Sequence, residues 1–471
     1  MLDSEDRVRE HSNASDDVPS AIRTYYSLIS VVDDAWSQLA SLKVFASANS
    51  TTVLDLIDIT FESSQQRKRI VRTFNSSNEF EHYLSRSSIE RGVRFISICQ
   101  RNSWANLNIC QSMLEAVVRK HSVMPEFLET IRCFQDRTCN VEEAFGGSSW
   151  KRCTLNRKEL TLVLKYPEHN GRIDGADPWS MRQTGIYQSY DTTNKTSVCV
   201  LLNPKENTAA ENRMKNIFDA EDGLSDANGQ PPVLGLVVLS TYLNNWRRYM
   251  AYYEKEELRI SGTVISAVID EKLHFSHSTL SQLRRLEARL LLLPPMFQAT
   301  TQAILNLEAY TDALHFNSNV SVGNYKSTKE ALQNYNNTTA AYSQNAVFIL
   351  NKVRGTGQLL SDTLNLKHQQ NAELISANML ALNNMAAKDS ATIRVITVVT
   401  LVFLPAQFVA TLFGMQFFST NALGKLIVSS SSIWIFFAVA IPFTLVTFGY
   451  WKWMEREQRL GAGLQVLEVK H

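Results

Sequence analysis

Two long apolar runs near the C-terminus dominate the pattern of hydrophobic and polar positions along the chain. Residues 393–417 carry a single charge, Arg394, close to their start, and residues 431–451 carry none. A helix of about 20 apolar residues crosses a hydrocarbon core of about 30 Å, so each run is long enough. We therefore predict two transmembrane helices, at 393–417 and 431–451, joined by an external loop at 418–430.

Upstream of the first run, apolar residues recur at helical spacing over a long distance. From about residue 326 the sequence contains no proline until Pro405, and Gly355 and Gly357 are its weak points as a helix. We predict one stalk helix that continues directly into the first membrane helix. The whole region 231–392 has a helical pattern, with an earlier helix over 277–315 that Pro294-Pro295 should kink or break.

The first half of the chain mixes strand and helix patterns. Apolar runs at 94–99, 160–164 and 198–202 predict buried strands, and a spacing near 3.6 over 105–120 predicts a helix. A stretch rich in turn-forming residues, 219–232, predicts a boundary. The expected fold class is α+β, with these parts in order: a flexible tail at 1–20, an α+β domain at 21–230, the helical region at 231–392, the two membrane helices, and a tail at 452–471.

Basic residues flank the predicted pair of membrane helices on one side. Five of them lie on the side of the two chain termini: Lys388, Arg394, Lys452, Arg456 and Arg459. The loop at 418–430 holds only Lys425. The positive-inside rule then predicts a multi-pass protein with both termini in the cytoplasm, and we expect the plasma membrane rather than an organelle. Glycosylation at the sequons of Asn194 or Asn319 would show the opposite topology.

Composition and motifs exclude several classes of function. The formal net charge is +1 and no long run of one sign occurs, which gives no support for nucleic-acid binding. The sequence contains no P-loop, GxSxG or HExxH motif, so we predict that the chain is not an enzyme and carries no resident cofactor. The six cysteines form no CxxC pair, which argues against a zinc site.

The first predicted membrane helix carries one face of mixed polar and aliphatic character. Its members recur at helical spacing: Ile393, Ile396, Thr400, Leu404, Gln407 and Thr411. Polar side chains at membrane depth often face a bundle interior or a water path. The alternative is hydrogen bonding between helices without conduction. Two spans from one chain cannot enclose a pore, so conduction would require an oligomer.

The end of the same helix contains a recognisable motif. Phe413, Gly414 and Met415 follow one another, and the step Leu404-Pro405 lies further back. This segment resembles the first transmembrane helix of the CorA family of divalent-cation transporters, which ends in Gly-Met-Asn after an aromatic residue. The order of an α+β domain, a stalk helix, a short loop and a second span matches that family too. The chain looks like the divergent fungal members.

The resemblance implies a homopentamer in the lipid bilayer, in which five copies of the first helix line a gradient-driven path for Mg²⁺. Gly414, Met415 and Gln416 would form the outer mouth, with Gln416 holding the hydrated metal ion. Mg²⁺ would be the transported ion and could also regulate the protein. The partners expected are other copies of this chain, the bilayer and divalent cations, but no nucleic acid.

The resemblance also assigns roles along the polar and aliphatic face. Leu404, Ile396 and Ile393 would form a hydrophobic gate that closes by dewetting. Gln407 would form a polar ring just outside that gate, and Pro405 would bend or loosen the helix beside it.

Three departures from the family pattern support an alternative. Gln416 stands where the family has asparagine, and the loop carries Lys425 but no acid. The stalk between 326 and 392 is poor in acids, with only Glu330, Asp362, Glu373 and Asp389. Because cation paths usually draw on carboxylates, the sequence leaves open a non-conducting, CorA-like membrane anchor that senses an ion or binds a partner.

Overall fold

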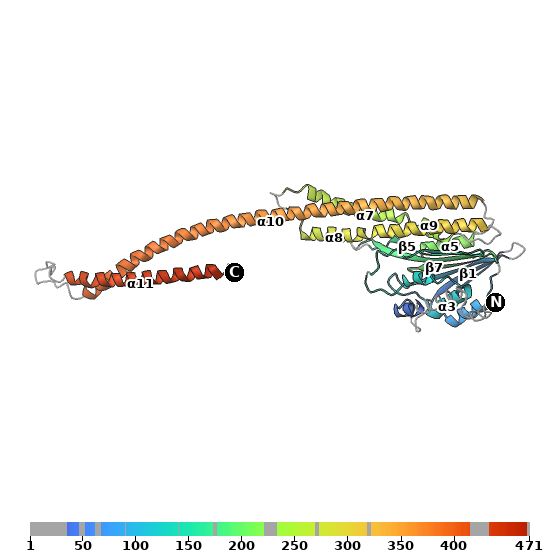
Figure 1. Ribbon diagram of the computed structural model, residues 1–471, viewed down its shortest axis with the longest axis horizontal. Helices are drawn as coiled ribbons and strands as arrows, with labels where there is room; N and C mark the ends of the chain where they lie inside the picture. The colour runs from blue at the N-terminus through green and yellow to red at the C-terminus, as the bar shows by residue number, and fades with distance from the viewer. Residues whose placement is uncertain are drawn as a thin grey trace, which may run out of the picture. The chain divides into compact units, whose positions relative to one another are not determined.

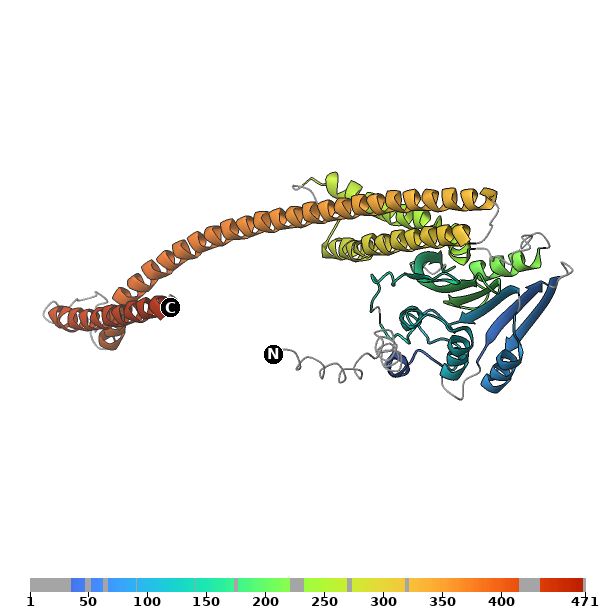
Figure 2. The same ribbon diagram turned by 45° about the vertical axis from the view of Figure 1, so that its right-hand side comes forward.

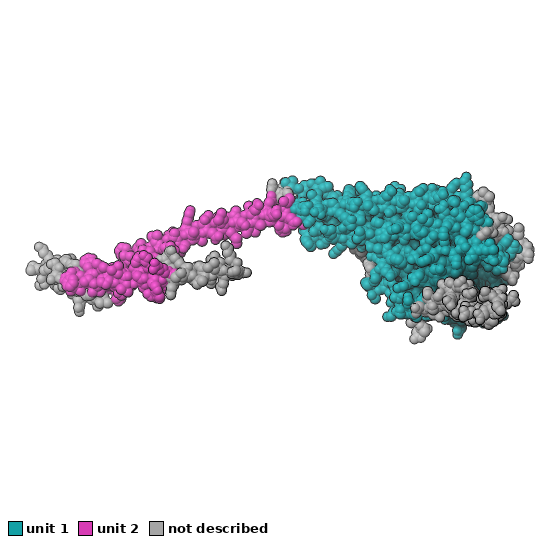
Figure 3. Space-filling view, in the orientation of Figure 1, with its two compact units in different colours: residues 1–363 teal, residues 364–471 magenta. Residues whose placement is uncertain are grey.

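The computed structural model describes the following residues: 35–46, 52–61, 67–89, 91–139, 141–172, 177–220, 233–268, 273–317, 322–414 and 433–468. These residues form two compact units, one ending at Thr363 and the other running from Leu364 onward. The division falls inside the longest helix, α10 (Val322–Gly414) (Figure 3).

The first unit is built on a mixed sheet of seven strands in the order β2-β1-β3-β7-β6-β5-β4. The strands are β1 (Leu54–Phe61), β2 (Arg67–Phe74), β3 (Gly92–Cys99), β4 (Trp150–Cys153), β5 (Arg157–His169), β6 (Trp179–Asp191) and β7 (Thr196–Asn203). β3 and β7 pair in parallel, and the other neighbours pair antiparallel. The strands predicted at 94–99, 160–164 and 198–202 are confirmed as parts of β3, β5 and β7.

Helices cover both faces of this sheet (Figure 1). One face packs against α2 (Ser77–Arg86), α3 (Gln111–His121) and α4 (Phe127–Arg132). The other packs against α5 (Ala209–Asp219), α6 (Leu234–Tyr242) and α9 (Leu293–Asn317). A strand buried on both faces needs apolar residues at every position, because successive side chains point to opposite sides. This is why β7 contains the unbroken apolar run 198–202, whereas β3 also buries Arg94 and Ser97 among its apolar residues.

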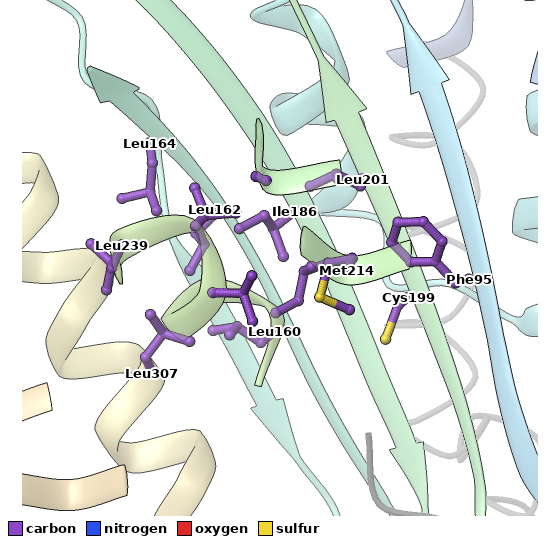
Figure 4. Close-up of a cluster of buried hydrophobic side chains, with 14 of the residues drawn as sticks. Phe95, Leu160, Leu162, Leu164, Ile186, Cys199, Leu201, Met214, Leu239 and Leu307 are labelled. Carbon is purple, nitrogen blue, oxygen red and sulfur yellow. The ribbon is translucent and has the colours of Figure 1, made fainter. Parts of the chain in front are cut away.

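Strand β7 shows how the two hydrophobic cores arise. Cys199 and Leu201 belong to the core beneath α5, α6 and α9, whereas Val198, Val200 and Leu202 belong to the core beneath α2, α3 and α4. Figure 4 shows the first of these cores, where side chains from the strands meet single residues from the helices. Those helical residues are Met214 of α5, Leu239 of α6 and Leu307 of α9.

Two helix predictions need comment. The helix predicted over 105–120 begins only at Gln111, so its first six positions were wrong. Leu107 instead forms short bridges with Phe45 and Gln100, which bury it in the strand layer. The break predicted at Pro294-Pro295 is confirmed, since α8 (His277–Leu291) ends and α9 begins at Leu293. Both prolines lie in the first turn of α9, where a missing N–H costs little.

The long stalk helix is confirmed as α10, a single helix of 93 residues. Its first part packs into unit 1, where a buried ion pair fixes it to α7 (Asn245–Ile265). Glu257 of α7 is 0% exposed, and its carboxylate meets Lys352 Nζ at 2.9 Å and accepts a hydrogen bond from Thr356 Oγ1 at 2.9 Å. Residues 433–451 of the second predicted membrane segment form part of α11 (Ile433–Glu468), which belongs to unit 2, and the first two residues of that segment lie outside the described residues.

Candidate ion path on the long helix

The candidate site lies on the C-terminal part of α10. Within the described residues, one helix is long and apolar enough to cross a membrane, judged by length and composition. The relevant window of α10 has a mean hydropathy of 2.0, and 11% of it is buried within the chain. Large apolar side chains are therefore left open, including Val395 at 65% and Phe403 at 66% exposure. A surface of this kind suits lipid or another subunit better than water.

The six predicted path residues are all open in the single chain, and they share one face. Ile393, Ile396 and Leu404 are 63%, 60% and 62% exposed. Thr400, Gln407 and Thr411 are exposed as well. At roughly 100° per residue, the six positions fall within an arc of about 80°. We call this set the polar–aliphatic stripe.

Helix α11 covers a different face of α10. In both ribbon views α11 runs beside the end of α10 (Figures 1 and 2). Pro405 is buried, and Val409 of α10 and Ala440 of α11 are each 5% exposed. Pro405 and Val409 lie roughly a third of a turn around the helix from the stripe. The stripe is therefore not covered by the chain's own second helix, and it remains available for contact with other copies of the chain.

The threonines of the stripe use their hydroxyl protons within the helix. Thr400 Oγ1 donates to the carbonyl of Ile396 at 2.7 Å, and Thr411 Oγ1 donates to the carbonyl of Gln407 at 2.9 Å. A hydroxyl that donates in this way keeps its oxygen lone pairs for an outside partner. Lone pairs suit water around a cation, so these two positions present acceptors rather than donors to the open face.

Pro405 lies inside α10 without ending it, since the helix continues to Gly414. A proline has no N–H, so the carbonyl of Leu401 loses its usual helical partner at this point. Pro405 is on the buried side, next to α11, and not on the stripe. Any effect on the proposed gate at Leu404 would thus pass through the helix backbone.

The predicted outer mouth is described only at its first residue. Gly414 is the last residue of α10. Met415, Gln416 and Lys425 lie outside the described residues. The role of Gln416 as the ion-binding ring therefore stays a prediction from the sequence.

The structure extends the stripe beyond the residues that the sequence reasoning selected. Ile375 and Leu382 of α10 are 59% and 63% exposed. By helical spacing they lie on the same arc as Ile393, and so does Asp389, which is also exposed. The signal that could have found Asp389 was its distance of one helical turn from Ile393. An acid on this face matters because the stalk otherwise has few of them.

Elsewhere in the described part of the chain, no group of three or more His, Cys, Asp or Glu residues could hold a metal ion. All six cysteines fall in that part and are free thiols. Burial raises the pKa of the Cys99 and Cys199 thiols to about 12, so both are neutral and behave as core residues.

Comparison with known proteins supports the family resemblance from a different part of the chain. Residues 19–163 match the model of the CorA-like transporters. The sequence motif lay at 403–417, so the two observations are independent, and the predicted resemblance to the CorA-like family is confirmed. The family that matches is one of transporters. Within the described residues, α10 is long and apolar enough to cross a membrane.

A curated fungal relative also matches, over a short stretch. The Notoamide biosynthesis cluster protein M' of Aspergillus versicolor is 37% identical over 90 residues, which make up 18% of this chain and 20% of that protein. This chain therefore covers only a fifth of that relative's length, and the match does not assign that relative's activity to this chain.

Several solved structures resemble the chain remotely. Full-length CmaX is 10% identical with a TM-score of 0.41, covering 87% of this chain and 100% of that one. The CorA magnesium transporter of Methanocaldococcus jannaschii is 11% identical with a TM-score of 0.29, covering 84% and 97%. The ZntB cytoplasmic domain of Vibrio parahaemolyticus is 10% identical with a TM-score of 0.33, covering 64% and 97%. Structural similarity at these TM-scores does not support an assignment of function to this chain.

Proposed function

We propose that this chain is a subunit of an oligomeric channel or transporter for divalent cations, with Mg²⁺ as the expected ion, driven by the electrochemical gradient. One observation carries the proposal: the polar–aliphatic stripe of α10 is open, while α11 covers another face. When copies assemble around an axis, the open stripe is the face free to line a shared path. A homopentamer is the assembly that the CorA resemblance implies.

In this proposal the stripe supplies three kinds of surface in sequence. Asp389 lies nearest the cytoplasm and attracts cations, one carboxylate per subunit. Ile393, Ile396 and Leu404 narrow and dry the path, so that the closed state excludes hydrated ions. Thr400 and Gln407 offer oxygen acceptors between and beyond the apolar rings.

Gln416 would complete the path at the outer mouth, next to Gly414 and Met415. Mg²⁺ gives up its water reluctantly, so an amide ring there would bind the hydrated ion through its waters. Both termini would lie in the cytoplasm, with the plasma membrane as the expected site. A glycan at Asn194, an exposed residue in the β6–β7 turn, would contradict this topology.

The proposal is tested by Mg²⁺ uptake into liposomes that contain the purified protein and a Mg²⁺-sensitive dye. Leu404→Ser places a hydroxyl in the proposed gate and should raise uptake severalfold, because a polar ring wets more easily. The control is Val402→Ser, which changes a nearby residue of 43% exposure that lies roughly opposite the stripe on the helix. Equal effects of the two substitutions would contradict the assignment of the stripe.

The second candidate function is a non-conducting membrane anchor that senses an ion or binds a partner. Gln416 in place of asparagine and the basic, acid-free loop at 418–430 favour it. Under this alternative, Gln416→Asn would leave uptake at zero. Under the transport proposal, the same change should raise Mg²⁺ uptake.

A further inference from the structure

A small cavity in unit 1 is lined by an unusual share of basic residues. Its volume is about 60 Å³. It lies where the loop after β3, the loop after α4 and strands β5 and β6 come together, far along the chain from the proposed ion path. The residues of its wall that matter here are Trp104, Arg137, Glu143, Lys165, Arg182 and Gln183.

The positive charges of this cavity are poorly neutralised. Lys165 is 7% exposed, and its Nζ donates to the carbonyl oxygens of Glu142 and Glu143 at 2.8 and 3.1 Å. Arg137 Nη2 donates to the carbonyl of Cys133 at 2.9 Å. Carbonyl oxygens satisfy the donors but bring no formal negative charge. Burying a cation without a counter-ion is costly, so these two groups favour an anion nearby.

The remaining charges do not cancel this excess. Arg182 Nε pairs with Glu168 at 3.3 Å, and the same carboxylate also pairs with Lys205 Nζ at 2.9 Å. The single carboxylate of Glu168 therefore neutralises only part of the two positive charges of Arg182 and Lys205. Glu143 is the acidic side chain in the wall, set against Arg137, Lys165 and Arg182. The wall as a whole is therefore positive.

Two polar atoms in the wall make no hydrogen bond in the described structure: Arg137 Nε and Gln183 Oε1. Gln183 is 6% exposed, and its Nε2 donates to the carbonyl of Cys133, which fixes which end of the amide carries the oxygen. Buried polar atoms are rarely left unpaired, so each calls for a partner. Arg137 Nε needs an acceptor, and Gln183 Oε1 needs a donor.

We propose that this cavity binds a phosphate group, held by Arg137, Lys165 and Arg182, with a protonated phosphate oxygen donating to Gln183. Phosphate meets both unpaired atoms at once, because near neutral pH it carries negative oxygens and a proton. Sulfate has a similar size and charge but no proton to donate at that pH. Trp104, 46% exposed, lies in the same wall. A phosphate ester such as a nucleotide monophosphate has lost its last acidic proton by pH 8, so the free ion is the phosphate that fits both unpaired atoms.

The state of Lys165 fits this assignment. Burial, and then the nearby charge of Arg137, lower the pKa of Lys165 to about 8, although the carboxylates of Glu143 and Glu142 act in the opposite direction. A bound phosphate would raise that pKa, because an anion favours the charged form of the amine. Binding near pH 8 should therefore take up protons from the buffer. This proposal does not depend on whether the chain transports ions.

Calorimetric titration of the full-length protein in detergent tests the site, with inorganic phosphate, sulfate and adenosine monophosphate as probes. We expect phosphate to bind at pH 8 with proton uptake, seen as a heat that changes with the ionisation enthalpy of the buffer. Lys165→Met should weaken phosphate binding roughly tenfold or more, since it removes a charge-assisted hydrogen bond. Lys151→Met, at an exposed lysine of neighbouring β4, should leave binding unchanged.

The three probes and the two variants distinguish the possible results. Competition of adenosine monophosphate with phosphate at the Lys165-dependent site would show that no phosphate proton is needed and would contradict the contact with Gln183, whereas phosphate binding without such competition would identify the free ion. If Lys165→Met does not fold, Arg137→Gln supplies the same test. No phosphate binding at millimolar concentration, binding unaffected by both substitutions, or sulfate binding as tightly as phosphate would overturn the proposal.

Discussion

At the scale of single residues, buried charge in unit 1 is held by compact networks. Arg94 is 0% exposed, and its Nε and Nη2 donate to the two carboxylate oxygens of Asp58, each at 2.8 Å. Tyr83 donates its hydroxyl proton to the same carboxylate at 2.7 Å. Such pairs add little net stability when intact, but removing one partner leaves an uncompensated charge.

Asp58→Asn should therefore destabilise unit 1 by about 3–5 kcal/mol, because the Arg94 guanidinium would remain buried without its counter-ion. Urea unfolding of the full-length protein in detergent measures the change. The control is Glu256→Gln, which removes the exposed pair with Arg259 and should cost less than about 1 kcal/mol. A loss for Asp58→Asn no greater than for this control would show that the buried network is not needed.

His121 gives unit 1 a pH dependence. Burial, and then the charges of Arg94 and Arg157, lower the pKa of His121 from 6.5 to about 3. Between those values the unfolded chain binds a proton that the folded chain does not, so stability falls as pH drops from about 6.5 towards 3. His121→Gln should flatten this part of the stability curve by up to about 1.4 kcal/mol per pH unit. Identical slopes in both proteins would refute this role.

At the scale of elements, a strand or helix is easiest to predict from the sequence when it is buried in the same way along its whole length. Central strands such as β3 and β7 are buried on both faces, and their apolar runs identify them directly. Edge strand β2 has the sequence RKRIVRTF and is mostly exposed to solvent, so its three arginines and one lysine hide the strand pattern. The start of α3 was missed because Leu107 bridges to Phe45, 62 residues earlier, as well as to the nearby Gln100, and no local pattern records the first of these contacts.

Two glycines offer a matched test of element packing. A Cβ on Gly92 of β3 would lie 2.1 Å from the carbonyl oxygen of Ile59 in β1, so Gly92→Ala should destabilise by about 1–3 kcal/mol. A Cβ on Gly262 of α7 would meet no atom within 4 Å, so Gly262→Ala should stabilise by about 0.5–1 kcal/mol. Thermal unfolding of both variants gives the signs, and two changes of equal sign would contradict this packing.

At the scale of the whole molecule, the candidate path was predictable in part. Residue spacing alone placed Ile393 to Thr411 on one face, and the structure leaves that face open while α11 covers another. Spacing could not reveal the cover by α11, because that depends on how two separate helices meet. The arrangement of a ring at Gln416 depends on several copies of the chain, so a pattern within one copy cannot determine it.

In the proposed function, the protein conducts divalent cations through a path that includes Gln416. The most direct test is Mg²⁺ uptake by liposomes containing the purified oligomer, compared with the same preparation carrying Gln416→Ala. We expect uptake by the unaltered protein and its loss in the variant, because the amide ring that holds the hydrated ion would be gone. No uptake from a correctly folded, unaltered oligomer would contradict transport and support the non-conducting anchor instead.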